Sequence, residues 1–362
     1  MSTEYPQPLW KLTLEGKDIT ANLAPRLMQL ALTDDRGLEA DQLDITLSDA
    51  DQRLDIPARG VKIHLALGWS DSGLIDKGYY TVDEVEHSGT PDQLTIRARS
   101  ADLREGITQT KERSWHATTV GAVVRKIADE HELEPVISDE LAGAEIAHQD
   151  QQSESDANFL SRLAEMFDAI CTVKADQLLF FKVARGKSAS GQTFAEVVLT
   201  RASGDRHRFS VADREGCQCV CASYYDVKAG RKKTVTIKAE KEAGKDKVAA
   251  SGDATRTLRH VYSCRASAAR AAKSALDRSQ RGVATFSLTL ALGRPDIVPE
   301  LPVRVSGWKP AIDGAGWRVA KVTHHLTTSG LTTDLELEMR AEPSEREEPE
   351  TPDPAEAPDG SD

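Results

Sequence analysis

The chain has little of what marks membrane-embedded or secreted proteins. No apolar run approaches the roughly 18 consecutive residues that identify a membrane-spanning helix. The segment Met1–Pro6 has no basic region followed by an apolar core, so no secretion signal is expected. The five cysteines are an odd number, which suits a reducing cytoplasm better than a disulfide framework. The sequence therefore predicts a protein without a membrane span that is made in the cytoplasm.

The sequence also lacks the motifs that usually carry catalysis or cofactor binding. Gly-x-Ser-x-Gly, His-Glu-x-x-His, the phosphate-binding loop and the dinucleotide fingerprint are all missing. The carboxylate pairs Asp34–Asp35 and Asp49–Asp51 lie in turn-like contexts, where solvated turns are the simpler interpretation. The pair His324–His325 lies on a predicted strand, so the two rings face opposite sides and cannot chelate one metal. We expect no catalytic, cofactor-binding or metal-binding residues, and no enzymatic activity.

Positive charge is in the minority. The 46 basic residues are outnumbered by 58 acidic ones, and the net charge of −12 argues against nonspecific nucleic-acid binding. The basic stretch Lys228–Lys247 is the one candidate for such contact, but acidic residues interrupt it and it contains no aromatic residue for base stacking. A solvated hairpin is favoured there, and contact with an acidic partner protein is the next alternative.

Three cysteines, Cys217, Cys219 and Cys221, alternate along a strand-like stretch, so their side chains are expected to share one face. A zinc site needs a turn of about two to four residues within each ligand pair and a second pair elsewhere. A buried strand of small residues is therefore the preferred interpretation.

The most informative feature that is present is an octet that occurs twice. Tyr80–His87 and Trp317–His324 share an aromatic residue, two valines and a histidine at identical offsets. His87 and His324 therefore end matched segments, which favours a structural role for both. The octet alone is about as well explained by chance, since strands draw on a narrow set of residues. Each copy also follows a Gly-Trp pair and a run of alternating aliphatic residues, and each precedes a glycine and another strand. That shared order favours a diverged duplication, which presents two similar surfaces from one chain and bears on assembly symmetry more than on catalysis.

The remaining pattern divides the chain into segments. Alternating residues around Leu43–Leu47, Val61–Leu67 and Leu94–Ile96 predict short strands of a small antiparallel barrel. Helices are predicted after Thr118 or Thr119 and from near Ser155, followed by two strands, which together indicate a compact α/β insert. Strands return from about residue 195, with an alanine-rich helix over Ser267–Arg281.

The predicted fold is thus mainly β with an inserted α/β domain. The last residues contain nine acidic residues and one arginine, with several prolines and no periodicity, which predicts disorder. The boundaries that we predict are 1–110 for a first β-barrel domain, 111–190 for the insert, 191–341 for a second β-barrel domain with the alanine-rich helix, and 342–362 for a disordered acidic tail.

Several stretches together resemble the late control D family, the tail hub proteins of contractile-tailed phages and R-type bacteriocins, which is similar in turn to the N-terminal hub part of VgrG spikes. The resemblance spans about residues 9 to 340, and its most specific part is His148–Ala164. The acidic tail does not map onto the family pattern. The other matching stretches are Ile19–Thr20, Leu30–Asp44, Gly78–Asp83, Ser114–Trp115, Thr257–Leu258–Arg259 with the helix that follows, and Gly316–Val319.

The resemblance implies homotrimers in which each subunit contributes two similar barrels, so that three copies form a pseudo-sixfold ring. One face of the ring then matches the hexameric tail tube, and the other matches the trimeric central spike. The implied partners are the tail tube, tail spike, tape measure and baseplate proteins, with no nucleic-acid recognition. The implied location is the bacterial host cytoplasm during assembly, then the virion tail or bacteriocin particle.

Other readings stay open at this point. A hub that carries or recruits a cell-wall hydrolase needs a carboxylate pair in a cleft, and a VgrG-like spike component needs a long β-helical extension. A transcription factor, which the family name suggests, needs a recognition helix or a basic face. Whether the parent particle is a phage, a defective prophage or a bacteriocin is not decided by the residues.

Overall fold

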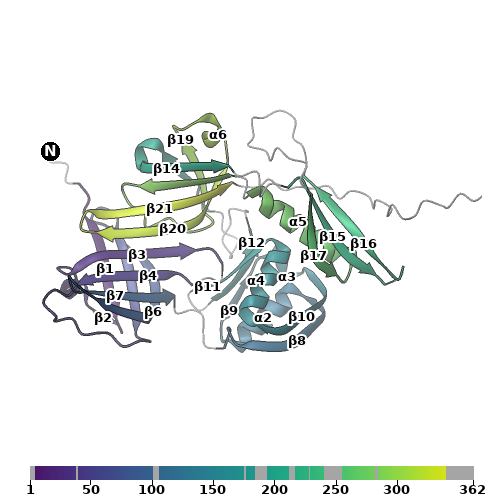
Figure 1. Ribbon diagram of the computed structural model, residues 1–362, viewed down its shortest axis with the longest axis horizontal. Helices are drawn as coiled ribbons and strands as arrows, with labels where there is room; N and C mark the ends of the chain where they lie inside the picture. The colour runs from purple at the N-terminus through teal and green to yellow at the C-terminus, as the bar shows by residue number, and fades with distance from the viewer. Residues whose placement is uncertain are drawn as a thin grey trace, which may run out of the picture.

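The computed structural model describes residues 5–37, 40–100, 106–174, 177–183, 194–211, 217–227, 229–239, 255–281 and 284–339. Within these ranges the protein is mostly β, with strands arranged in several sheets and the longer helices gathered away from the largest one (Figure 1). No helix there is both long enough and apolar enough to cross a membrane. The predicted acidic tail and the second half of the basic stretch lie outside the described residues.

Strands from both ends of the chain form one 13-stranded sheet. Its main path runs β14-β18-β21-β20-β3-β4-β7-β6-β5-β1-β2, with β19 paired to β20 and β13 to β19. We call residues 5–100 the N-terminal half, and residues 194–211 with 284–339 the C-terminal half. The N-terminal half contains β1 (Pro8–Leu14), β2 (Lys17–Asp18), α1 (Thr20–Leu23), β3 (Leu27–Asp35), β4 (Gln42–Ser48), β5 (Lys62–Trp69), β6 (Gly73–Ser88) and β7 (Gln93–Ser100). The C-terminal half contains β13 (Val197–Thr200), the 3-10 turn η1 (Arg201–Ser203), β14 (Gly204–Val211), β18 (Ala284–Leu290), β19 (Pro302–Ser306), α6 (Pro310–Asp313), β20 (Trp317–Thr327) and β21 (Gly330–Met339).

Each half has its own apolar core, built from every second residue of its strands. In β4, Leu43, Ile45 and Leu47 are buried while their neighbours are partly exposed, as the alternation in the sequence predicts. Leu326 and Leu331 belong to the C-terminal half but pack into the core of the N-terminal half. The two cores therefore meet across the line where the halves join.

The α/β insert follows the N-terminal half. Its core is formed largely by the apolar faces of two helices that begin where the sequence predicts. Thr119 Oγ1 accepts a hydrogen bond from the Ala122 amide (3.2 Å), and Ser155 Oγ accepts one from Asn158 (3.2 Å), so both helices have side-chain caps. The elements are β8 (Thr110–Thr119), α2 (Val120–Glu130), β9 (Glu134–Ile137), α3 (Asp139–Ala142), β10 (Glu145–Ser155), α4 (Asp156–Phe167), β11 (Ala169–Lys174) and β12 (Gln177–Lys182).

A separate three-stranded sheet lies beside the insert, at the right of Figure 1. It contains β15 (Cys219–Asp226), β16 (Arg231–Lys238) and β17 (Thr255–Tyr262), and α5 (Arg265–Arg281) covers one face. The narrow stripe of Ala268, Ala272 and Leu276 lets α5 approach Val220 and Ala222 of β15 closely. The sequence placed these strands in the second barrel. The structure instead gives them a sheet and a core of their own, while the domain boundaries stay predictions.

Two ionic contacts, one buried and one partly buried, fasten the insert to its surroundings. Asp168, in the left-handed conformation after α4, receives two hydrogen bonds from Arg281 at the end of α5, one of them 2.9 Å long. Lys174 of β11 reaches the N-terminal half, where its Nζ lies 2.7 Å from Asp34 Oδ1 and 3.4 Å from Asp41 Oδ2. The insert is thus held to both α5 and β3.

We expect Arg281→Met to lower the free energy of unfolding by about 3–5 kcal/mol, because the buried Asp168 carboxylate loses its compensating charge. The double variant Arg281→Met/Asp168→Asn should cost less than the single one, since no buried charge remains and asparagine tolerates the left-handed conformation. Urea denaturation of the set measures this. Arg278→Met, an exposed position one turn earlier, should cost about 0.5 kcal/mol. A double variant no more stable than the single one would contradict the assignment.

The second contact predicts a pH dependence. Burial, reinforced by the charge of Asp34, raises the pKa of Asp41 from 3.8 to about 7. The folded state keeps the proton on Asp41 up to about pH 7, whereas the unfolded chain loses it near pH 3.8. The contribution of Asp41 to the free energy of unfolding is therefore fully present below pH 3.8 and is lost as pH rises through about 7. Asp41→Asn removes this loss, so its stability relative to the native chain should improve by about 2 kcal/mol between pH 5 and pH 8.

Denaturant unfolding at the two pH values measures the difference. The control variant is Asp55→Asn, at an exposed loop position. It should change the free energy of unfolding by the same amount at the two pH values. A native chain and an Asp41→Asn variant with the same pH slope would show that Asp41 does not titrate in this range.

Candidate assembly interface

The repeated octet corresponds to a repeated piece of structure. Tyr80–His87 lies in β6 between β5 and β7, and Trp317–His324 lies in β20 between β19 and β21. In both copies the strand carries a bulge at the fourth octet position, Asp83 or Ala320, where one extra residue interrupts the ladder. A shared irregularity at the same position is hard to obtain by chance, so it supports the duplication that the sequence predicts.

The correspondence extends to strands that the octet does not reach. The order β3-β4-β7-β6-β5-β1 in the N-terminal half matches β14-β18-β21-β20-β19-β13 in the C-terminal half. A second bulge is shared, at Met28 of β3 and Asp205 of β14. Following the ladders from the octets makes Leu32 of β3 equivalent to Phe209 of β14. Sequence comparison misses this pair of strands because only the period-2 alternation is common to them.

The halves join through an antiparallel ladder between β3 and β20, seen at the left of Figure 1. We call this ladder the internal joint. It pairs seven residues of each strand, from Lys321 opposite Asp35 to Thr327 opposite Gln29. At most 3% of each inward-facing apolar side chain is exposed. These side chains are Leu30, Leu32, Val322 and Leu326.

Outward-facing side chains complete the internal joint. Lys321 Nζ lies 3.1 Å from Asp35 Oδ2, and the hydroxyls of Thr33 and Thr323 lie 3.5 Å apart across the ladder. The internal joint is heterologous, because β3 pairs with the counterpart of β6 and not with its own counterpart β14.

The two octet histidines have different environments. His324 is fully buried in the internal joint, where Nδ1 lies 2.9 Å from Thr333 Oγ1. Burial, with the nearby charge of Lys77, lowers the pKa of His324 to about 3, so this ring is neutral near pH 7. His325 faces the other side of the strand, as its adjacent position predicts, and its Nε2 lies 3.2 Å from Asp334 Oδ2. His87 is exposed and lies 3.3 Å from Asp49.

A buried ionic cluster lies beside the internal joint. Arg318 at the start of β20 bonds Glu338 of β21 and, at 2.9 Å, Glu300. Arg36, just after β3, also bonds Glu338, with one contact of 2.7 Å. Burial raises the pKa of Glu338, but the hydrogen bond and charge of Arg36 outweigh it and hold this pKa below its usual value. Glu338 thus ties the N-terminal half to two strands of the C-terminal half.

One group in the described part of the chain has the composition of a metal site. Glu130, His131 and Asp156 place their ligand atoms within 4.8 Å of one another in the insert. Lys111 Nζ lies 2.6 Å from Asp156 and 2.8 Å from Glu130, and Arg113 bonds both carboxylates. These two cations already neutralise the carboxylates, so the group is an internal ion cluster that locks β8 to α2 and α4.

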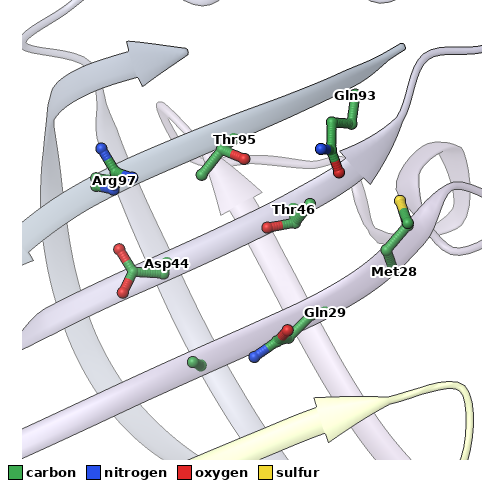
Figure 2. Close-up of a pocket in the computed structure, with 8 residues that line it drawn as sticks. Met28, Gln29, Asp44, Thr46, Gln93, Thr95 and Arg97 are labelled. Atoms are coloured by element: carbon green, nitrogen blue, oxygen red, sulfur yellow. The ribbon is translucent and has the colours of Figure 1, made fainter. Parts of the chain in front are cut away.

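One hollow on the described part of the chain is shallow and polar. It measures about 540 Å³ and lies over the outer face of β3, β4 and β7, where Asp44, Thr46, Thr95 and Arg97 point from neighbouring strands to the same side (Figure 2). It contains no histidine, cysteine or serine that a neighbouring base activates, so it offers no nucleophile and base pair. Its other lining residues are Met28, Gln29, Ala31 and Gln93.

The carboxylate pairs noted in the sequence have structural partners. Asp49 accepts hydrogen bonds from the Arg53 and Leu54 amides (3.0 Å each) and so shapes the turn after β4. Asp51 receives two hydrogen bonds from Arg26, of 2.5 and 2.6 Å.

The three alternating cysteines do not all share one face. Cys217 precedes β15 and is buried against α5, whereas Cys219 and Cys221 lie on the strand and are half-buried. Val220 and Ala222 are the residues of β15 that face the helix. The expectation of one shared face is therefore wrong for Cys217, because the strand begins two residues after it.

The first part of the basic stretch forms the predicted hairpin. β15 and β16 pair antiparallel from Cys219–Lys238 to Asp226–Arg231, and Lys233 Nζ lies 3.0 Å from Asp226.

Comparison with known proteins identifies the family and several relatives of this chain. The family model of the phage tail baseplate hub (GPD) matches residues 36–330. A probable baseplate hub protein of Escherichia phage 186 is 45% identical, with 92% of this chain and 93% of the relative covered. Among solved structures, the tail protein from Neisseria meningitidis MC58 has a TM-score of 0.66 at 15% identity, covering 92% of this chain and 96% of that one.

The resemblance to VgrG-like proteins is also confirmed at the level of fold. The E. coli c3393 protein, a type VI secretion component described as similar to the T4 tail proteins gp27 and gp5, has a TM-score of 0.52 at 14% identity. The match covers 90% of this chain and 76% of that protein. Since the family model spans most of the sequence and a hub relative aligns along nearly its whole length, the chain belongs to the phage tail baseplate hub family.

Proposed function

We propose that the protein is a structural hub of a contractile injection system. Three copies form a pseudo-sixfold ring that adapts a hexameric tail tube to a trimeric central spike, without enzymatic activity. The observation that carries the proposal is the correspondence of the two halves, which share strand order and two bulges. A ring of three such chains presents six similar β units.

The internal joint supports a ring because of its symmetry. A heterologous contact leaves the complementary edge of each partner free, so repeating it either closes a ring or extends a filament. A threefold ring of six near-equivalent halves offers one face with apparent sixfold symmetry and another that differs between halves. In the sequence, the insert lies between the two halves, and the sheet of β15–β17 lies between β14 and β18. Each occurs once per chain and therefore three times per ring.

The partners that this function requires are the tail tube, the tail spike, the tape measure and neighbouring baseplate proteins. Assembly in the host cytoplasm and residence in the finished tail particle follow from that role. A hub that itself hydrolyses cell wall is less well supported, because the hollow of Figure 2 pairs its carboxylate Asp44 with threonines and Arg97 and has no second acid.

Native mass tests the proposal. Size exclusion coupled to light scattering, on the protein alone and mixed with the spike protein of the same particle, should give a species of roughly three times the 39.4 kDa chain mass in at least one sample. The reason is that the free edges of the halves remain unsatisfied in a monomer. A strict monomer in both samples would overturn the ring.

A further inference from the structure

The internal joint uses β3 of the N-terminal half and β20 of the C-terminal half. The counterparts of these two strands, β14 in the C-terminal half and β6 in the N-terminal half, have open edges. β14, the counterpart of β3, is the end of the sheet path, and among the described strands it pairs only with β18. β6, the counterpart of β20, is covered by β5 as far as Thr81, and Val82 makes two further backbone hydrogen bonds, with Gly60 and Val61. Beyond it, the β6 edge at residues 84–88 has no backbone partner in the described part of the chain.

The open edges have the exposure of an interface that lacks its partner. His324 is fully buried in the internal joint, whereas 40% of the side chain of the equivalent His87 is exposed. Val322 is fully buried, whereas the equivalent Val85 is half-buried. On the other strand, Val211 of β14 is 44% exposed.

The same contrast in exposure holds between β3 of the internal joint and its counterpart β14. Leu30 and Leu32 of β3 are at most 1% exposed, while their counterparts His207 and Phe209 are exposed and half-buried. Positions that are sealed in the internal joint are thus open at both free edges. A strand laid along either edge would cover apolar surface as well as pair the backbone.

The charges on the two open edges are complementary. Glu84 and Glu86 project from β6 with 58% and 51% of their side chains exposed, and they share one cation, Arg97 of β7, at 2.6 and 3.4 Å. Arg206 and Arg208 project from the same outward side of β14, are exposed, and have no ion-pair partner among the described residues. The equivalent positions in the internal joint hold other residues. They are Lys321, Thr323, Gln29 and Ala31.

Resting on the proposed ring, we infer that β14 of one copy pairs antiparallel with β6 of the next copy, in the register of the internal joint. The register follows when each residue of the β3–β20 ladder is replaced by its equivalent, β20 residues by those of β6 and β3 residues by those of β14. Glu86 then also lies diagonal to Arg208, within reach of an ion pair. The inferred pairs are Val85 with Val211, Glu86 with Ser210, His87 with Phe209, and Ser88 with Arg208.

The charge difference gives the contact its specificity. An N-terminal half and a C-terminal half can join both within a chain and between chains, so the two kinds of joint must be told apart. Acidic β6 against basic β14 favours the contact between copies, whereas the Lys321–Asp35 pair belongs to the internal joint alone. Two copies of the same open edge would place like charges together.

A cysteine pair tests the inferred register. In Glu86→Cys/Ser210→Cys, the two thiols should oxidise between copies and give covalent dimers and trimers on non-reducing gels. The matched positive control is Thr33→Cys/Thr323→Cys, whose hydroxyls lie 3.5 Å apart and whose disulfide forms within one chain. Glu86→Cys/Arg206→Cys is displaced by four residues, about 13 Å along the strand, and should not cross-link. The single variants report any contribution of the native cysteines.

Light scattering on the same samples separates the possible failures. A trimer with no Glu86–Ser210 cross-link, while the internal control oxidises, would overturn this register and leave the ring intact. Equal cross-linking in the displaced pair would likewise overturn the register. A monomer under all conditions, including with the spike protein, would overturn the ring and this contact together.

A charge exchange tests the same contact without oxidation. Glu86→Arg or Arg208→Glu alone should weaken association about fivefold per contact, because each places like charges across the joint. The double variant Glu86→Arg/Arg208→Glu should regain most of the loss, since every contact then has a reversed but complementary pair. Thr323→Arg, at the equivalent position of the internal joint, is the control for added charge. A double variant no better than the singles would contradict the pairing.

Discussion

The backbone ladder between β3 and β20 is the constraint on which the rest of the molecule depends. It pairs residues nearly 300 positions apart, and through it strands from both ends of the chain become one sheet. Closing so long a loop is costly in entropy, and the compensation is visible around the ladder. Apolar side chains seal its inner face, and Glu338 holds Arg36 and Arg318 on either side of it. The insert and the small sheet with α5 are excursions from this joined core.

Much of this architecture could be predicted from the residues, and the successes share a cause. The octet, the caps at Thr119 and Ser155, and the apolar stripes of α2 and α4 are local patterns, each specified by residues close in sequence. The absence of an active-site motif directed attention to assembly and away from chemistry. Family membership followed from a motif, His148–Ala164, whose buried Gln151 and Asp156 bind the cations of the insert.

What could not be predicted depends on contacts between distant residues. The equivalence of β14 and β3 is visible only in the ladders and in a bulge that leaves no mark in the sequence. His87 and His324 occupy the same octet position, yet only the structure shows that one is sealed and the other open. The strands β15–β17 read as part of a second barrel, because a strand pattern does not say which sheet it joins.

The covalent link between the two halves has a consequence for the concentration at which a ring can form. Six separate halves would need six encounters to close, each with its own loss of translational freedom. Fusing the halves in pairs makes three of those joints intramolecular, where the effective concentration of one half near the other reaches about the millimolar range. In the proposed ring of three copies, only three joints then depend on the protein concentration. Carrying both halves in one chain would therefore lower the concentration at which such a ring closes.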